Sequence, residues 1–320
     1  MPVLSDLKKS LEKICLAGLV SLTSCTPGEF KVVRLNNAPT YDEVTSQEDI
    51  REVPFAYWNA ADLRGDTPNL FEFISAATSQ QRADSVGTYF REQGLGIIGL
   101  GEVDYDDTAK TGFRDQAIDI AAAMNSPYDY VVVDQYMVSR LFPWTTGNGM
   151  VLQYPAKVVH RHLFGEDEPF DSRLGHLFKD FIHVKIKVGK RELDVILSHL
   201  DDEDNLTFSR RRDELEKILA YAAKVKQENE HAYIAFMADA NAVQDSSEMR
   251  RVLTHGLFHP PERNYGIPTH RSHNPTMGIS HVFVTQNMEI QDYDRFCPQD
   301  NKGEYISDHC GVKGVFVFKD

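Results

Sequence analysis

Short apolar segments that each end in a polar residue recur from about residue 52 to the C-terminus, and they constrain the fold more than any other feature. Apolar segments of this length, set apart by turn residues, predict buried β-strands rather than helices. The polar residues at their ends are Asn59, Glu102, His199, Asp239 and Asn241, and the pair Asp308 and His309 stands just before the last segment. Because layered α/β folds bring strand ends together, these side chains are expected to share one site.

Helical patterns alternate with the strands, which predicts one mixed α/β domain over residues 51–320. Strands are expected within 53–60, 94–104, 128–136, 148–164, 180–200, 233–241, 279–286 and 311–318, with a break at Pro155 and a hairpin turn at 188–190. Helices are expected at 79–93, 112–124, 208–228 and 245–254. No internal repeat or linker interrupts this stretch, so a second domain is not expected.

Residues 1–25 contain an apolar run, ICLAGLVSLTSC, which follows several lysines and ends in Cys25. The run has the length of a signal-peptide core, and its end resembles the bacterial lipoprotein box in which the cysteine carries lipid. An amphipathic N-terminal helix is the alternative, because apolar residues recur at helical spacing from Leu4. Residues 26–50 are polar and aperiodic, which indicates a tether with at most one short strand. The expected location is the cell envelope or the exterior, with lipid attachment at Cys25; the cytoplasm is the alternative.

The net charge of the chain is −14, with an isoelectric point near 5.3. Such a surface repels polyanions at long range, which argues against a protein that coats nucleic acid. A local basic groove could still bind a phosphodiester. The charge therefore narrows the nature of a substrate without excluding phosphate chemistry.

The chain has four cysteines, too few for a disulfide scaffold. Cys297 and Cys310 flank a segment that is long enough to fold back on itself. Two states are therefore open for this pair: a bridge in an oxidising compartment, or two buried and reduced thiols.

The residue types at the strand ends indicate phosphate chemistry. Carboxylates and amides such as Glu102, Asp239, Asn241 and Asp308 are hard oxygen ligands of the kind that Mg²⁺ or Mn²⁺ prefers. Histidine exchanges protons near neutral pH. Hydrolysis of a phosphoester needs a cation to neutralise the phosphate, a base to activate water, and donors for the transition state.

The motifs around these residues resemble the endonuclease/exonuclease/phosphatase superfamily, which includes DNase I-like nucleases, bacterial sphingomyelinases and inositol-polyphosphate phosphatases. The matching segments run in the family's order over residues 52–320: YWNAADLRG, IIGLGEVD, GNGMVLQYP, ILSHLDD followed by RRRDELEKIL, MADAN and ISDHCGV. Each motif alone is weak, whereas six in order are specific. The resemblance implies a four-layer α/β sandwich, in which two packed mixed β-sheets are flanked by helices.

The resemblance also implies the metal site and the catalytic groups. Glu102, with help from Asp308 and Asn59, would hold Mg²⁺ or Mn²⁺ against a phosphate oxygen. His309 would activate the attacking water, and His199 would donate to the phosphate or to the leaving group. The remaining positions, which would place the water or the transition-state oxygens, are Asp239 and Asn241.

Two further residues are expected to contact the substrate. Asn148 lies in the segment that is similar to the family's Gly-Asn stretch. Arg211 belongs to the run 210–212, which is either a solvated helix face or a source of one inward-turning arginine.

One position departs from the family pattern. The family usually carries an aspartate that orients the terminal histidine, and Ser280 occupies this position in the segment GISHVFV. A serine hydroxyl can hold one tautomer of His309, but it cannot stabilise an imidazolium as a carboxylate does. Activity would then be lowered, or another acid would substitute.

The expected function is a divalent-metal-dependent phosphoesterase, with a nuclease as the commonest outcome by analogy. A phospholipid head group or another small phosphoester follows closely, because the negative charge disfavours long duplex DNA. A catalytically weakened family member that acts as a binding module is the alternative. No obligate protein partner is evident from the sequence.

Overall fold

The structure is a computed structural model that describes residues 30–66, 74–105, 111–112, 114–125, 127–139, 144–164, 179–201 and 208–319. The expected signal segment 1–25, together with Cys25, lies outside the described residues. Among the helices that the structure describes, none combines the length and the apolar character needed to cross a membrane.

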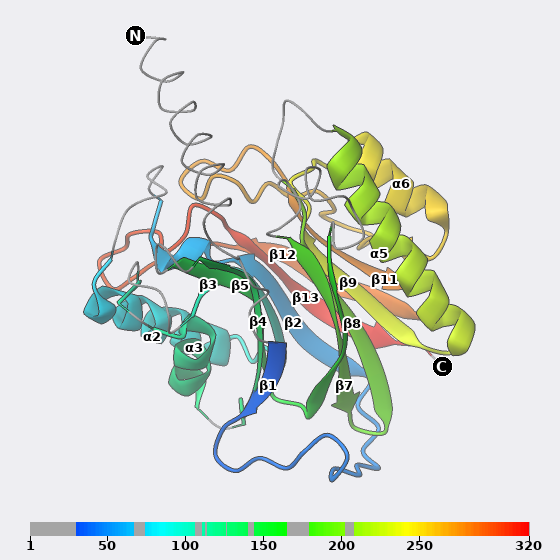
Figure 1. The fold of residues 1–320 in the computed structure, drawn as a ribbon, viewed down its shortest axis with the longest axis horizontal. Helices are drawn as coiled ribbons and strands as arrows, with labels where there is room; N and C mark the ends of the chain where they lie inside the picture. Colours follow the sequence, from blue (N-terminus) through cyan, green and yellow to red (C-terminus); the bar gives the residue numbers. More distant parts are fainter. Residues whose placement is uncertain are drawn as a thin grey trace.

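Two mixed β-sheets form the middle of the molecule (Figure 1). The first sheet contains β1 (Phe30–Arg34), β2 (Glu52–Asn59), β3 (Ile97–Asp104), β4 (Tyr130–Ser139), β5 (Trp144–Leu152), β12 (Met288–Phe296) and β13 (Gly311–Phe318). Its spatial order is β1-β4-β5-β3-β2-β13-β12. The second sheet contains β6 (Ala156–Leu163), β7 (Asp180–Val188), β8 (Arg191–His199), β9 (Tyr233–Asp239), β10 (Phe258–His259) and β11 (Ser280–Thr285). Its order is β10-β11-β9-β8-β7-β6.

Helices cover the outer face of each sheet, which gives four layers (Figure 1). The helices are α2 (Ala76–Glu92) and α3 (Gln116–Met124) on the first sheet, and α5 (Phe208–Glu228) and α6 (Ser247–His255) on the second. The caps of α2 and α3 follow from sequence, because Ser75 and Asp115 each accept a backbone hydrogen bond from the first turn. The four-layer sandwich expected from the family resemblance is therefore confirmed.

Three apolar clusters hold the layers together. One lies between the two sheets and includes Tyr57, Leu197 and Met237. The other two lie between each sheet and its helices, with Phe90 in one and Leu219 in the other. Strands that face apolar layers on both sides carry near-continuous apolar runs, which is why their sequences show little alternation.

Each sheet contains one parallel pair among the pairings that the structure describes. These pairs are β2–β3 and β8–β9. A helix makes each crossover, α2 in the first sheet and α5 in the second. Both strands of a parallel pair end at the same edge of the sheet, so the topology gathers four of the predicted polar strand ends.

Within the segment 26–50, β1 is the one short strand that the sequence allowed. From residue 30 onward this segment packs on the domain, because β1 pairs with β4 and extends the first sheet. The Lys187 ammonium group also donates to the backbone carbonyls of Tyr41 and Val44. A strand that the sequence pattern did not predict, β12, pairs with β13, and a register shift between Gln291 and Asp294 interrupts its alternation.

Of the two states open for Cys297 and Cys310, the structure has the bridge, with the two Cα atoms 4.3 Å apart. The disulfide closes the loop that leads into β13. Closing a loop of this size contributes roughly 2–3 kcal/mol in the chain-entropy model. The bridge therefore steadies the backbone on either side of residue 309.

Candidate active site

Four predicted site residues lie at one edge of the two sheets. Asn59, His199 and Asp239 are the last residues of β2, β8 and β9, and Glu102 lies near the end of β3. The first three side chains are buried. This arrangement follows from the two parallel pairs, which end on the same side.

Asp239 is fully buried, and its carboxylate is held by hydrogen bonds from both sides. Oδ2 accepts a hydrogen bond from Asn59 Nδ2 at 2.9 Å, and Oδ1 accepts one from the backbone N–H of Asn241 at 3.1 Å. Burial raises the pKa of Asp239, but the interactions with His309 and His199, together with these hydrogen bonds, outweigh burial and lower the pKa below its usual value. The carboxylate is therefore ionised near neutral pH and fixed in orientation.

Asn59, expected to support a metal, uses both ends of its amide within the protein. Nδ2 donates to Asp239, while Oδ1 accepts the backbone N–H of Ala61 at 3.0 Å. The backbone carbonyl of Asn59 also accepts a hydrogen bond from Ser307 Oγ at 2.8 Å. In this geometry Asn59 positions the carboxylate of Asp239 and ties β2 to the loop before β13.

His309 is 8% exposed and faces two carboxylates. Its Nδ1 lies 3.5 Å from Asp239 Oδ2, and its Nε2 lies 3.8 Å from Asp308 Oδ1. Its backbone is held at both ends, because the N–H donates to Ser307 Oγ and the carbonyl accepts from Trp58 Nε1. Asp239 thus lies where it can set the tautomer of His309, with Nε2 facing away from it.

His199 and Asn241 form a second unit at this edge. Asn241 Nδ2 donates to the backbone carbonyl of Leu200 at 2.9 Å, which fixes the orientation of the amide, and the same nitrogen lies 3.1 Å from His199 Nε2. Nε2 must then accept, so His199 carries its proton on Nδ1, which lies 3.5 Å from Glu102 Oε1. Both ring nitrogens of His199 face protein groups, so donation to a phosphate requires one of these contacts to exchange.

Glu102 reaches His199 from an irregular point of β3. The register with β5 shifts between Leu100 and Val103, and Glu102 has a positive φ of 48°. This conformation is strained for a residue other than glycine, and strained backbone of this kind is typical of functional sites. Its side chain is 31% exposed, so the carboxylate can contact both His199 and solvent.

Asp308 faces two imidazole rings that lie next to each other. One belongs to His309 and the other to His270, whose Nε2 lies 3.9 Å from Asp308 Oδ2. Burial raises the pKa of Asp308, but His270, His309 and Arg64 outweigh burial and lower it. The carboxylate is therefore ionised at neutral pH.

Ser280 does not take over the task of the missing aspartate. It is 2% exposed and pairs in register with Asp239 across β11 and β9. Its Oγ has no hydrogen-bond partner within the described part of the chain. The acid nearest to His309 Nδ1 in the structure is Asp239, which corresponds to the expectation that another acid would substitute.

Asn148 differs from its expected role as a substrate contact. It is fully buried in β5, and its Nδ2 donates to Asp180 Oδ1 at 3.2 Å. Its carbonyl accepts a hydrogen bond from the Tyr105 hydroxyl. Because no part of the side chain reaches the surface, Asn148 belongs to the core rather than to a substrate surface.

Arg211 is the inward-turning member of its run, but it also contacts protein rather than open space. Its Nη1 donates to the backbone carbonyl of Asn241 at 2.5 Å, and its Nε donates to Glu248 Oε1 at 3.4 Å. Nη1 also lies 3.4 Å from the carbonyl of Asp201. Arg211 therefore positions the backbone at Asn241, and its expected contact with the substrate stays a prediction.

Sequence reasoning missed two residues of this region. Nothing in the neighbouring sequence singles out His270, yet its ring centroid lies 4.6 Å from that of His309. Tyr57 was not singled out, although its buried hydroxyl accepts the backbone N–H of Asp239 at 2.6 Å. No periodicity marks the loop around His270, so only the fold reveals its position.

The donors at this edge fit a hard divalent cation. Asp308 is ionised, and its Oδ1 is buried without a hydrogen bond from any described residue. Glu102 supplies a second, partly exposed carboxylate. Oxygen donors of this kind suit Mg²⁺ or Mn²⁺.

The family model that matches the sequence describes the Endonuclease/Exonuclease/phosphatase family and covers residues 56–309. The match begins in β2 and ends at His309, so it spans the whole edge described above. A search among curated proteins gave no match to the chain.

Solved structures share the fold at low sequence identity. A Beutenbergia cavernae endonuclease/exonuclease/phosphatase is 14% identical with a TM-score of 0.61, covering 84% of this chain and 72% of its own. A mannosyl-6-phosphatase of Bacteroides thetaiotaomicron is 16% identical with a TM-score of 0.60, covering 83% of this chain and 100% of its own. Truncated TDP2 of Caenorhabditis elegans is 13% identical with a TM-score of 0.58, covering 84% and 100%.

Proposed function

Since this chain belongs to the endonuclease/exonuclease/phosphatase family, we propose that it is a divalent-metal-dependent phosphoesterase. Members of the family are generally hydrolytic phosphoesterases. The observation that carries the proposal is the contact between His309 and the ionised, buried carboxylate of Asp239. A histidine oriented in this way is a base for water activation.

In this proposal His309 accepts a proton from water at Nε2. Asp239 faces Nδ1, so it holds the proton there and leaves Nε2 free to accept. The carboxylate also stabilises the imidazolium that forms. The distance of 3.5 Å is longer than a hydrogen bond and would shorten when a substrate is bound.

Asp308 and Glu102 would hold the metal ion, for which we propose Mg²⁺ or Mn²⁺. When bound, such an ion neutralises phosphate charge and polarises the phosphorus–oxygen bond. Glu102 would act from its position beside His199. Through the contact between Glu102 and His199, the bound cation would lie near the second histidine of the site.

His199 and Asn241 would stabilise the phosphate oxygens. In the structure they contact each other at 3.1 Å, so they act as one unit that Arg211 and Glu102 support from either side. A phosphate oxygen would take the place of His199 Nε2 as the acceptor of the Asn241 Nδ2 hydrogen bond, so one hydrogen bond substitutes for another. His199 would donate to the phosphate from Nε2 only after it gains a proton there.

For the substrate, we propose a small phosphoester or a phospholipid head group ahead of long duplex DNA. The net charge of −14 supports this choice, since phosphate contacts along a duplex need lysines and arginines. The mannosyl-6-phosphatase with the same fold acts on a small phosphoester by its name. We further propose that the protein works in the cell envelope or outside the cell, attached through Cys25 if that residue carries lipid.

The test is hydrolysis of bis-p-nitrophenyl phosphate and p-nitrophenyl phosphate with and without Mg²⁺ or Mn²⁺, extended to plasmid DNA, RNA, sphingomyelin and inositol phosphates. We expect metal-dependent turnover that disappears in His309→Ala and falls by about two orders of magnitude in Glu102→Gln. The matched control is His231→Ala, which removes a histidine that is 87% exposed. Absence of turnover across the panel would favour the binding module.

A further inference from the structure

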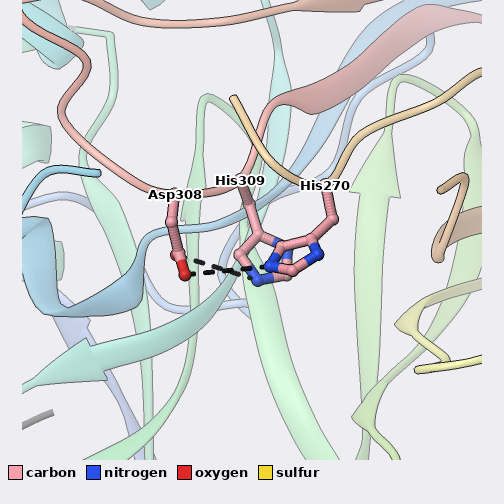
Figure 2. A group of neighbouring side chains, drawn as sticks. All are labelled: His270, Asp308 and His309. Carbon is pink, nitrogen blue, oxygen red and sulfur yellow. Dashed lines mark ion pairs between the residues drawn. The ribbon is translucent and has the colours of Figure 1, made fainter. Parts of the chain in front are cut away.

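Two histidines and one aspartate lie close together near the N-terminal end of β13 (Figure 2). The candidate ligand atoms of His270, Asp308 and His309 all lie within 4.8 Å of one another. The two carboxylate oxygens of Asp308 divide between the rings: Oδ1 faces His309 Nε2 at 3.8 Å, and Oδ2 faces His270 Nε2 at 3.9 Å. These separations are too long for hydrogen bonds, so the three side chains do not satisfy one another.

The backbone brings the three residues together before any ligand is bound. His270 and His309 form an isolated antiparallel bridge. On one side of it the Cys310 N–H donates to Thr269 O at 2.7 Å, and on the other the Ser272 N–H donates to Asp308 O at 2.9 Å. The disulfide to Cys297 anchors the same strand. None of these contacts uses the side chain of His270.

The absence of an aspartate at position 280 leaves His309 without the partner that the family usually supplies. Ser280 Oγ makes no hydrogen bond to any described residue, and His309 Nδ1 has only the longer contact with Asp239. His309 is therefore freer to turn its Nε2 toward another group than a histidine held by a short carboxylate hydrogen bond.

We propose that His270, Asp308 and His309 form a binding site for a Zn²⁺-class transition-metal ion, which shares Asp308 with the oxygen-ligand site proposed for Mg²⁺ but adds two imidazole nitrogens. Two imidazole nitrogens and one carboxylate are a ligand set typical of zinc with one open position. Imidazole favours zinc over magnesium, which prefers oxygen ligands.

The spacing of the donors suits such an ion. Zinc binds nitrogen and oxygen at about 2.0–2.2 Å, which places tetrahedral ligand atoms about 3.3–3.5 Å apart. The separations of 3.8 and 3.9 Å, which run to the two different oxygens of Asp308, would need to contract by about half an ångström, and the other separations, all within 4.8 Å, by up to about 1.5 Å. Side-chain rotations supply such movements. The side chains of His270 and Asp308 are 20% and 29% exposed, so an ion can enter from solvent.

This site has a consequence for catalysis that rests on the proposed function. The same Nε2 of His309 would either accept a proton from water or bind zinc, and it cannot do both. Zinc would therefore inhibit hydrolysis supported by Mg²⁺. Removal of His270 would relieve the inhibition while His309 stays available as a base.

The direct test measures metal binding by the tag-free, full-length protein. Binding of Co²⁺ is monitored by its visible d–d absorption, and binding of Zn²⁺ is measured by calorimetry. We expect the wild type to bind Co²⁺ with the intense bands of a four- or five-coordinate site that zinc displaces. His270→Ala should weaken binding at least about tenfold and lose these bands. His273→Ala, a control in the same loop, and Glu102→Gln should retain them.

The proposal is overturned if His270→Ala binds Co²⁺ as the wild type does, or if the wild type shows only the weak bands of an octahedral oxygen site. His270→Asn serves as a second variant, and thermal melts show whether each variant folds. Because the spectra need no turnover, they test this site even if hydrolysis is never observed. Once hydrolysis is measured, zinc should inhibit the wild type at concentrations about tenfold lower than those that inhibit His270→Ala.

Discussion

The central residue of the site is Asp239, because its carboxylate contacts three groups from separate segments of the chain. It accepts hydrogen bonds from Asn59 and from the backbone of Asn241, and its Oδ2 also faces His309. The family position that normally orients the histidine is occupied by Ser280, whose hydroxyl is unpaired among the described residues. In the proposed mechanism, the orienting task therefore falls on a carboxylate that also accepts a hydrogen bond from the loop after β9.

We predict that Asp239→Asn lowers kcat by roughly three to four orders of magnitude, the scale seen when the orienting acid of a catalytic histidine becomes an amide. The amide cannot stabilise an imidazolium and can hold the wrong tautomer of His309. The measurement is kcat and KM at saturating metal. The matched control is Asp194→Asn, which alters a buried aspartate–histidine pair with His183 at 2.7 Å, elsewhere in the fold. Equal losses in the two variants would show a general stability effect instead.

We predict that Ser280→Asp raises activity or shifts its pH optimum. A second carboxylate in register with Asp239 adds negative charge near His309, and this raises the pKa of the histidine and favours one tautomer. The ascending limb of the pH–rate profile should then move to higher pH, because His309 must lose its proton before it can act as a base. A profile superimposable on that of the wild type, from a folded variant, would place Ser280 outside the reach of His309.

At the scale of elements, a buried polar cluster joins the two sheets away from the catalytic edge. Arg161 on β6 lies 3.0 Å from Asp134 on β4 and 2.7 Å from Asp180 on β7. Asn148 on β5 donates to Asp180. Burial and the neighbouring Asp180 charge raise the pKa of Asp134 well above its usual value, so it keeps its proton at neutral pH. Burial raises the pKa of Asp180 as well, but Arg161 at 2.7 Å opposes this rise, so Asp180 is the carboxylate that pairs with Arg161.

We predict that Asp134→Asn changes the free energy of unfolding by less than about 1 kcal/mol, whereas Arg161→Met costs about 3–5 kcal/mol at pH 7. Asparagine imitates the protonated acid, while loss of the arginine leaves a buried charge unpaired. Because the folded pKa of Asp134 is raised, the native state binds the extra proton, and stability falls as the pH rises above about 4. That slope should be smaller in Asp134→Asn. Denaturant unfolding across pH decides, and comparable costs for the two variants would contradict the assignment.

The whole molecule carries a net charge of −14, which sets how it meets large substrates. Long-range repulsion slows the approach of a polyanion and is screened by salt, whereas it affects a small phosphoester much less. The catalytic edge itself is rich in acids and histidines, and Arg211 is committed to backbone carbonyls. Charge thus disfavours duplex DNA at both long and short range.

We predict that any cleavage of duplex DNA, relative to bis-p-nitrophenyl phosphate, stays level or rises between about 50 and 200 mM salt. A protein that binds DNA through many lysines and arginines shows a steep fall over the same range. Initial rates for the two substrates, measured in one buffer series, give the ratio. A steep fall of this ratio with salt would indicate a local basic groove and would make nucleic acid the favoured substrate.

The sequence by itself determined the elements and the residue types of the site. Apolar runs predicted the main strands, the strong pattern at 208–228 predicted α5, and a polar residue at each strand end predicted a common edge. These features are local, because the residues within and next to a strand determine whether it is buried and where it ends. The strand β12 escaped prediction because a register shift breaks its alternation.

Only the tertiary structure decided which side chains meet. It placed Asn148 in the core and Arg211 on backbone carbonyls, and it brought His270 against His309. These outcomes depend on contacts between segments that lie far apart in the chain, such as the bridge between residues 270 and 309. The neighbouring residues of a side chain on a polar loop do not indicate its partner. The contact forms only when the fold places a distant segment of the chain next to that loop.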